Sequence, residues 1–140
     1  MLGLTREVSE IANTPRAAQA ACMAVGILIF FDDYANVLLA GETMRPILDL
    51  LSVSREKLSF IVDATAAPIA SISPVSSWVG FEIGLVQDAI DTLSSRNLDT
   101  PLTIPDSGMA VFLRSLRYSY YSFFMLGLIA MLIFSQRDYG

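Results

Sequence analysis

The chain has 140 residues, of which 54% are hydrophobic and 16% charged, with a formal net charge of −5. This balance excludes a disordered chain and argues against an ordinary water-soluble domain, which carries about 25% charged residues. The negative charge and the lack of a basic patch argue against nucleic-acid binding. With no histidine and a single cysteine, Cys22, the sequence has no histidine base, no zinc-site pattern and no intrachain disulfide.

The first long apolar segment predicts one membrane-spanning helix over residues 14–36. Thr14 followed by Pro15 is a typical helix start, and residues 17–31 carry no charge. Such a helix places Asp32 and Asp33 in or near the apolar layer, at a cost of about 2.5–3.5 kcal/mol for a central carboxylate. Because the two carboxylates repel and burial disfavours their charge, we expect a raised pKa for at least one. The alternative is that both lie at the headgroup level and only end the helix.

The middle of the chain predicts irregular helices. Residues 37–51 predict an interrupted helix, because Arg45-Pro46 follows Gly41 closely. The uncharged run 64–81 contains Pro68 and Pro74, which argue against one straight helix, and lipid does not tolerate irregular backbone. Residues 64–81 therefore predict a re-entrant hairpin that is buried in protein or lines a wet cavity. A Ser-rich surface loop is the alternative.

The last third predicts two more helices separated by a polar connection. Residues 82–91 predict a helix. Gly80 lies just before it and Gly84 inside it, at a spacing that lets another helix approach closely. Residues 92–108 predict an extramembrane loop, and 112–136 predict a second spanning helix. As a helix, the uncharged run 118–136 is about 28 Å long, close to the thickness of the hydrocarbon layer.

Carboxylates and hydroxyls beside the apolar runs are the candidate site residues. A carboxylate pair can bind either a proton or a cation, which is the minimal chemistry of cation–proton exchange, and hydroxyl oxygens suit a hard cation. The expected ion- and proton-binding residues are Asp32, Asp33, Asn36, Asp63 and Thr65, with the three aspartates as Na⁺ ligands. The expected substrate-path residues are Thr43, Arg45, Ser73, Ser76, Ser77 and Glu82. Structural alternatives stay open: a Glu42–Arg45 ion pair, and serines bonded to helix carbonyls.

A series of these segments, in fixed order, closely resembles the NhaC-type Na⁺/H⁺ antiporter family. The segments are FFDDYAN at 30–36, TMRP at 43–46, SREKL at 54–58, IVDATAAP at 61–68, SSWVG at 76–80 and RDYG at 137–140. The likeness is strongest over residues 24–90. It implies a secondary transporter of the bacterial or archaeal inner membrane that exchanges Na⁺ for H⁺, with no cofactor beyond the transported ions.

The resemblance also implies a fold class and partners. The wider superfamily uses inverted repeats with re-entrant hairpins, so we expect an all-α membrane protein forming part of such a repeat. Family members are several times longer. The expected partners are therefore the lipid bilayer and either the missing remainder of a transporter or further copies of this chain, and no nucleic acid.

Three other functions stay open. Arg45 favours exchange of a small organic carboxylate coupled to Na⁺ or H⁺, and the short length favours a non-transporting truncated subunit. An intramembrane aspartyl hydrolase is disfavoured, because Asp32 and Asp33 point in different directions on a helix and a dyad needs a distant partner such as Asp63. We therefore expect no enzymatic activity.

Overall fold

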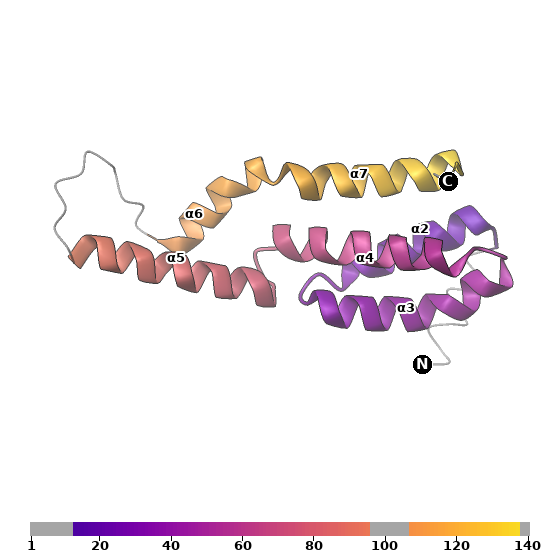
Figure 1. Ribbon diagram of the computed structural model, residues 1–140, viewed down its shortest axis with the longest axis horizontal. Helices are drawn as coiled ribbons and strands as arrows, with labels where there is room; N and C mark the ends of the chain where they lie inside the picture. Colours follow the sequence, from indigo (N-terminus) through magenta and orange to yellow (C-terminus); the bar gives the residue numbers. More distant parts are fainter. Residues whose placement is uncertain (1–12, 96–106, 138–140) are drawn as a thin grey trace.

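The computed structural model describes residues 13–95 and 107–137, and the regular elements in these ranges are all helices (Figure 1). They are α2 (Pro15–Leu28), α3 (Asp33–Leu50), α4 (Arg55–Ile72), α5 (Ser77–Ser95), α6 (Gly108–Ser115), the short 3-10 helix η1 (Leu116–Tyr118) and α7 (Tyr120–Ser135).

Helix α4 lies at the centre of the molecule. It packs against α2, α3 and α7, and α2 also packs against α3 and α7. Helices α5 and α6 pack against each other and extend as an arm from this four-helix group, to the left in Figure 1. The arrangement gives α4 neighbours on several sides, so its side chains dominate the core.

The core forms where α3 and α7 face α4. Met44 and Leu48 lie one turn apart on α3, and Ile129 and Ile133 lie one turn apart on α7, so each pair covers one face of its helix. All four side chains are almost fully buried, as is Ile61 on α4. Burial of this apolar surface is the main force that holds the four-helix group together.

The expected re-entrant hairpin over 64–81 is wrong. Helix α4 continues through Pro68 to Ile72, the chain breaks only at residues 73–76, and α5 then begins at Ser77. Pro68 removes one helical hydrogen bond, but its side chain is fully buried. Packing around the ring therefore compensates for the lost bond, and only the second proline, Pro74, lies at a break.

The predicted fold class, a multi-span membrane protein with part of an inverted repeat, is also wrong. In the described ranges one stretch is long and apolar enough to cross a membrane, Arg55–Ser95 across α4 and α5. Its most apolar 18 residues have a mean hydropathy of 1.4, and half of them are buried inside the molecule. A second exists only if α6–η1 and α7, bent by 48°, count as one span. The core helix of a soluble protein meets the same criterion.

The helix boundaries show why the length of an uncharged run did not predict the length of a helix. The helix expected over 14–36 is two helices, because α2 ends at Leu28 and the Asp32 carboxylate caps α3 by accepting a hydrogen bond from the Ala35 amide at 2.8 Å. The helix expected to be interrupted over 37–51 is continuous in α3, with Pro46 inside it. Residues 82–91 lie within α5, and 112–136 bend at η1. Most of the expected loop over 92–108 lies outside the described residues.

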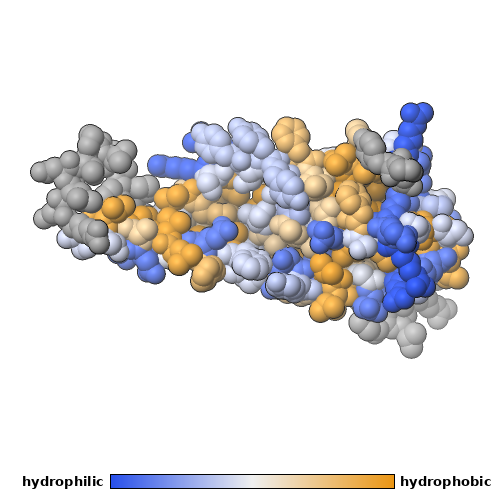
Figure 2. Space-filling view, viewed as in Figure 1, coloured by the Kyte–Doolittle hydropathy of each residue, from blue (hydrophilic) through white to orange (hydrophobic). Residues whose placement is uncertain are grey.

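Large apolar side chains remain exposed over much of the surface (Figure 2). Helix α7 is the clearest case: Phe124 is 75% exposed and Phe134 69% exposed, whereas only Ser122, Ile129 and Ile133 are buried. A helix that is apolar on all sides is normally covered on all sides, by protein or by lipid. The four-helix group therefore leaves large apolar side chains of α7 uncovered.

Candidate functional site

Two chain breaks meet at one end of the four-helix group, and we call them together the helix-break junction: residues 29–32 between α2 and α3, and 73–76 between α4 and α5. Three hydrogen bonds link the first break and the start of α3 to the start of α5. The Ser77 amide donates to the Phe31 carbonyl at 2.9 Å, and its hydroxyl donates to Asp32 Oδ2 at 2.9 Å. The Trp78 indole donates to Asp33 Oδ1 at 2.7 Å.

The two adjacent carboxylates therefore hold the junction together. Both are partly exposed, and neither forms an ion pair with another residue in the described ranges. The Ala35 amide, then the Ser77 hydroxyl, lower the pKa of Asp32 below its ordinary value, while desolvation acts weakly in the opposite direction. The raised pKa expected from burial is not found at Asp32, because hydrogen-bond donors stabilise its charged form.

One turn into α3, a buried asparagine bonds the end of α2. The Asn36 side chain is fully buried and donates to the carbonyls of Gly26 at 2.6 Å and Ile29 at 3.1 Å, at the end of α2. Thr65 of α4 is fully buried beside it. Asn36 Oδ1 and Thr65 Oγ1 have no hydrogen-bond partner in the described structure. We call these two atoms the buried oxygen pair.

Gly26 makes this close approach possible. A Cβ atom at this position would lie 3.0 Å from Thr65 Cγ2 and 3.4 Å from Asn36 Oδ1. The Thr65 methyl group and Asn36 Oδ1 thus lie against the same point on α2, where a larger residue would displace a neighbour. Two of the five expected ion-binding residues, Asn36 and Thr65, are brought together here, with Asp32 and Asp33 one turn away at the junction.

Asp63 is separated from this group. It lies two residues before Thr65, hence about 200° around the helix, and is exposed in a groove of about 480 Å³ between α3 and α4. Arg45 and Glu42 line the same groove, yet the expected Glu42–Arg45 ion pair is not formed. The ion pair in the described part of the chain joins Arg55 to Asp49 at 3.2 Å. No group of three acidic, histidine or cysteine side chains suited to a metal exists in these ranges.

The other expected substrate-path residues have local structural contacts or lie apart. Ser76 donates to the Ala70 carbonyl at 2.7 Å and accepts from the Val79 amide at 3.2 Å, so it joins the end of α4 to the start of α5. Ser73 bonds only within its own turn, to Val75. Glu82 is exposed on α5, and Thr43 is partly exposed on α3, two turns beyond Asn36.

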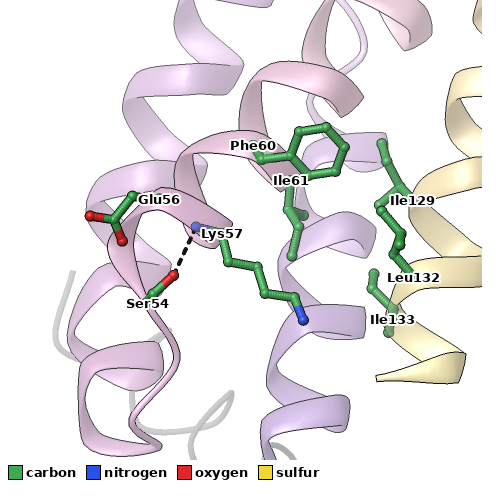
Figure 3. A pocket seen from close by; sticks show the side chains of 8 residues that line it. All are labelled: Ser54, Glu56, Lys57, Phe60, Ile61, Ile129, Leu132 and Ile133. Carbon is green, nitrogen blue, oxygen red and sulfur yellow. Dashed lines mark hydrogen bonds between the residues drawn. The ribbon is translucent and has the colours of Figure 1, made fainter. Parts of the chain in front are cut away.

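A second pocket of about 290 Å³ lies between the start of α4 and the end of α7 (Figure 3). Phe60 and Ile61 face Ile129, Leu132 and Ile133 across it, and Lys57 reaches over its mouth whereas Glu56 points away. None of the residues expected from the sequence to form a site lines this pocket.

Sequence reasoning missed two residues of the junction region. Gly26 stands alone in an otherwise apolar helix, where glycine is less favourable than alanine, and this mismatch was the available signal. Trp78, the single tryptophan, gave no signal of its own, because its partner Asp33 is distant in sequence. The expectation for Gly80 and Gly84 is not met in the described structure, since no atom lies within 4 Å of where their Cβ atoms would stand.

Comparison with known proteins gives a relative that matches only part of the chain. No family model and no solved structure matches the chain. A protein of Haemophilus influenzae described as "Uncharacterized protein" is 39% identical over 79 residues, which are 56% of this chain and 15% of that protein. The chain therefore matches about one seventh of a much longer relative.

Proposed function

We propose that this chain is a segment of a secondary-active exchanger of Na⁺ for H⁺, of the NhaC type, in the bacterial or archaeal plasma membrane. The observation that carries the proposal is the helix-break junction, where two chain breaks meet beside two carboxylates that form no ion pair in the described structure. Breaks between helices leave backbone carbonyls and amides free to bind ions, and transporters use such breaks at their substrate sites.

The charge pattern around the junction favours a cation. The chain has no lysine or arginine between Arg16 and Arg45, nor between Lys57 and Arg96, and these two stretches supply both breaks. The carbonyl end of α2 adds a partial negative charge at the same place. With Asp32 and Asp33, these groups produce a negative potential that attracts a cation and disfavours an anion.

The bonds of Asp32 provide a link between proton binding and movement. Its charged form is stabilised by the Ala35 amide and the Ser77 hydroxyl, so a proton binds at Asp32 only when these bonds weaken. Proton uptake would then loosen the contact between the first break and α5. A carboxylate that opens the junction on protonation and closes it when charged supplies one step of an exchange cycle.

The remaining parts of the transporter come from outside this chain. Exposed apolar side chains on α7 and α5 need cover, and the relative is several times longer. We propose lipid and the remainder of a longer assembly, or further copies of this chain, as the cover.

The test uses the assembly that co-purifies with the tagged chain from its own membrane, reconstituted in proteoliposomes. Added Na⁺ should dissipate an imposed pH gradient, and Asp32→Asn or Asp33→Asn should slow this several-fold. Glu56→Gln, an exposed carboxylate at the start of α4, is the matched control and should leave the rate unchanged. Unchanged flux in the Asp32→Asn/Asp33→Asn double variant would exclude the carboxylates, and no flux with a co-purifying larger partner would favour a non-transporting subunit.

A second function, Na⁺- or H⁺-coupled exchange of a small carboxylate, is favoured by one observation. Arg45 is exposed in the groove between α3 and α4 and forms no hydrogen bond or ion pair in the described ranges. An unpaired guanidinium binds carboxylates through paired hydrogen bonds. In the same proteoliposomes, Na⁺ flux that depends on an added carboxylate and is lost in Arg45→Gln would establish this function instead.

A further inference from the structure

Two polar side-chain atoms are buried without a hydrogen-bond partner in the described part of the chain. Asn36 and Thr65 are 0% exposed, and Asn36 Oδ1 and Thr65 Oγ1 have no hydrogen-bond partner in the described structure. Buried polar atoms are nearly always hydrogen-bonded, because leaving them unpaired is unfavourable. Two such atoms, on side chains that both approach Gly26, therefore call for a specific explanation.

The orientation of the Asn36 amide is fixed by its neighbours. Its nitrogen faces two carbonyls, of Gly26 and Ile29, and only the NH₂ group can donate to them. The Asn36 oxygen must then point away from these carbonyls. Asn36 Oδ1 and Thr65 Cβ each lie 3.4 Å from the position of a Cβ at Gly26, and the Thr65 methyl group lies 3.0 Å from it, so the two side chains approach the same point from α3 and α4.

We infer that the buried oxygen pair, Asn36 Oδ1 and Thr65 Oγ1, supplies ligands to a small monovalent cation where α2, α3 and α4 meet. This inference rests on the proposed exchange of Na⁺ and moves the ion from the carboxylates to neutral oxygens. Hard cations such as Na⁺ are bound by amide, hydroxyl and carbonyl oxygens. Pro68 adds another candidate, because it removes the amide that would otherwise bond the Ala64 carbonyl, next to Thr65.

The charge and composition around the pair select the class of ligand. No basic residue lies in residues 17–44 or 58–95, the carbonyl end of α2 points here, and Asp32 and Asp33 lie one turn away, so a positive ion is favoured over an anion. A divalent ion would need several carboxylates, and the described ranges contain no acidic cluster of that kind. Neutral oxygens with carboxylates at a distance suit a single positive charge.

The carboxylates then have a different task from direct coordination. Asp32 is bonded to Ala35 and Ser77, and Asp33 to Trp78, so they fasten the junction above the pair. A cation at the buried oxygen pair lies one turn of α3 away from this closed junction. Because Trp78 is the single tryptophan and bonds to Asp33, its fluorescence follows whether the junction stays closed.

The experiment measures thermal unfolding of the purified full chain in detergent, followed by Trp78 fluorescence, in sodium chloride and in choline chloride at equal ionic strength. A ligand that binds the folded state raises the Tm in proportion to its free concentration relative to its Kd. We expect Na⁺ to raise the Tm above that in choline, with potassium and lithium chlorides as arms that define ion preference.

Thr65→Val is the decisive variant, since valine keeps the shape of threonine and removes only the hydroxyl. In choline its Tm should equal or exceed that of the wild type, because an unpaired buried hydroxyl is gone. The Na⁺-dependent rise in Tm should be lost. Thr92→Val, at an exposed threonine on α5 that bonds the Asp88 carbonyl, is the matched control and should keep the rise.

Several outcomes would overturn the inference. A wild-type chain with no Na⁺-dependent rise, or a Thr65→Val variant that keeps the rise, would show that the pair does not bind the ion. A Thr65→Val variant that is less stable in choline would show that the hydroxyl is bonded already, for example to a trapped water. Na⁺ binding through Thr65 without Na⁺-driven proton flux would contradict the proposed function alone, and flux that Thr65→Val leaves unchanged would contradict this inference alone.

Discussion

At the scale of single residues, Asn36 connects the end of α2 to α3. Its NH₂ group satisfies two carbonyls that the end of α2 leaves free, and its oxygen approaches the same point on α2 as the Thr65 side chain. The asparagine is therefore needed for the fold as well as for the proposed site. This double role is the reason why the hydroxyl of Thr65, and not the amide of Asn36, is the better probe of ion binding.

The space at Gly26 gives a residue-scale prediction. Gly26→Ala gains about 0.5–1 kcal/mol from helix propensity, but the new Cβ lies 3.0 Å from a buried methyl group of Thr65. Overpacking of this kind costs about 1–3 kcal/mol. We expect Gly26→Ala to lower the free energy of unfolding by up to about 2.5 kcal/mol in denaturant titrations.

Gly41→Ala on α3 is the matched control, because nothing lies within 4 Å of its Cβ position. It should raise the free energy of unfolding by about 0.5–1 kcal/mol. Equal stabilisation by the two substitutions would contradict the close packing of α2 against α3 and α4.

At the scale of helices, the starts and ends of the elements decide the architecture. Asp32 caps the start of α3. Ser54 caps α4 by accepting a hydrogen bond from the Lys57 amide, and Ser107 caps α6 by accepting one from the Ala110 amide. Each is a side-chain oxygen that satisfies a free amide of the first turn. These caps divide an apolar sequence into helices shorter than its uncharged runs suggest.

The cap at α3 gives a prediction about pH. The native pKa of Asp32 is lower than the ordinary value of 3.8, because the Ala35 amide and the Ser77 hydroxyl stabilise the charged form. Its contribution to stability is therefore complete above that value and is lost as the pH falls through the lowered native pKa. Asp32→Asn keeps a capping oxygen without the charge, so it should be less stable than the wild type at neutral pH, and the difference should shrink in acid.

Chemical unfolding of both proteins across the acid range checks this. Glu82→Gln, at an exposed carboxylate on α5, should unfold in parallel with the wild type at every pH. A gap between Asp32→Asn and the wild type that stays constant down to the lowest pH would exclude the charge of Asp32 as its cause.

At the scale of the whole molecule, the described helices do not cover their own apolar surface. Helix α7 exposes several of its own phenylalanines and tyrosines, and in α5 the buried residues are only Val79 and Ile90. Contiguous exposed apolar surface of this kind marks a site of contact with protein or membrane. The proposed cover by lipid and by a larger assembly follows from this imbalance.

The exposed face of α7 gives a prediction for the whole chain. Expressed alone, the chain should stay in the membrane fraction after an alkaline wash. Phe124→Glu combined with Phe134→Glu should release most of it, because charged side chains are costly in an apolar layer. Ser59→Glu combined with Ser115→Glu, at exposed polar positions, is the control and should release none. Release of the wild-type chain by the wash would contradict cover by lipid.

The basic residues gather at one end of the four-helix group only in the three-dimensional structure. In the sequence, the segment 45–57 and the segment 96–117 carry three basic residues each. In the structure, α2 begins and α7 ends at one end of the four-helix group, as the contact of Gln19 with Gln136 shows, and α4 begins there beside the end of α7. This end carries the basic residues Arg16, Arg55, Lys57 and Arg137 together with the acidic Asp49 and Glu56. Hydrophilic side chains, blue in Figure 2, gather at this end. Asp32 and Asp33, between the end of α2 and the start of α3, lie at the other end.

The sequence by itself determined the helical character, the apolar composition, the helix start at Thr14, and the identity of Asn36 and Thr65 as candidate residues. These properties follow from side-chain chemistry and local backbone preference, which act over a few residues. The tertiary structure decided which candidates meet. It placed Thr65 inward and Asp63 outward, engaged Asp32 and Asp33 in hydrogen bonds with α5, and let α4 continue through Pro68, because packing between distant segments outweighs a local preference of a few kcal/mol.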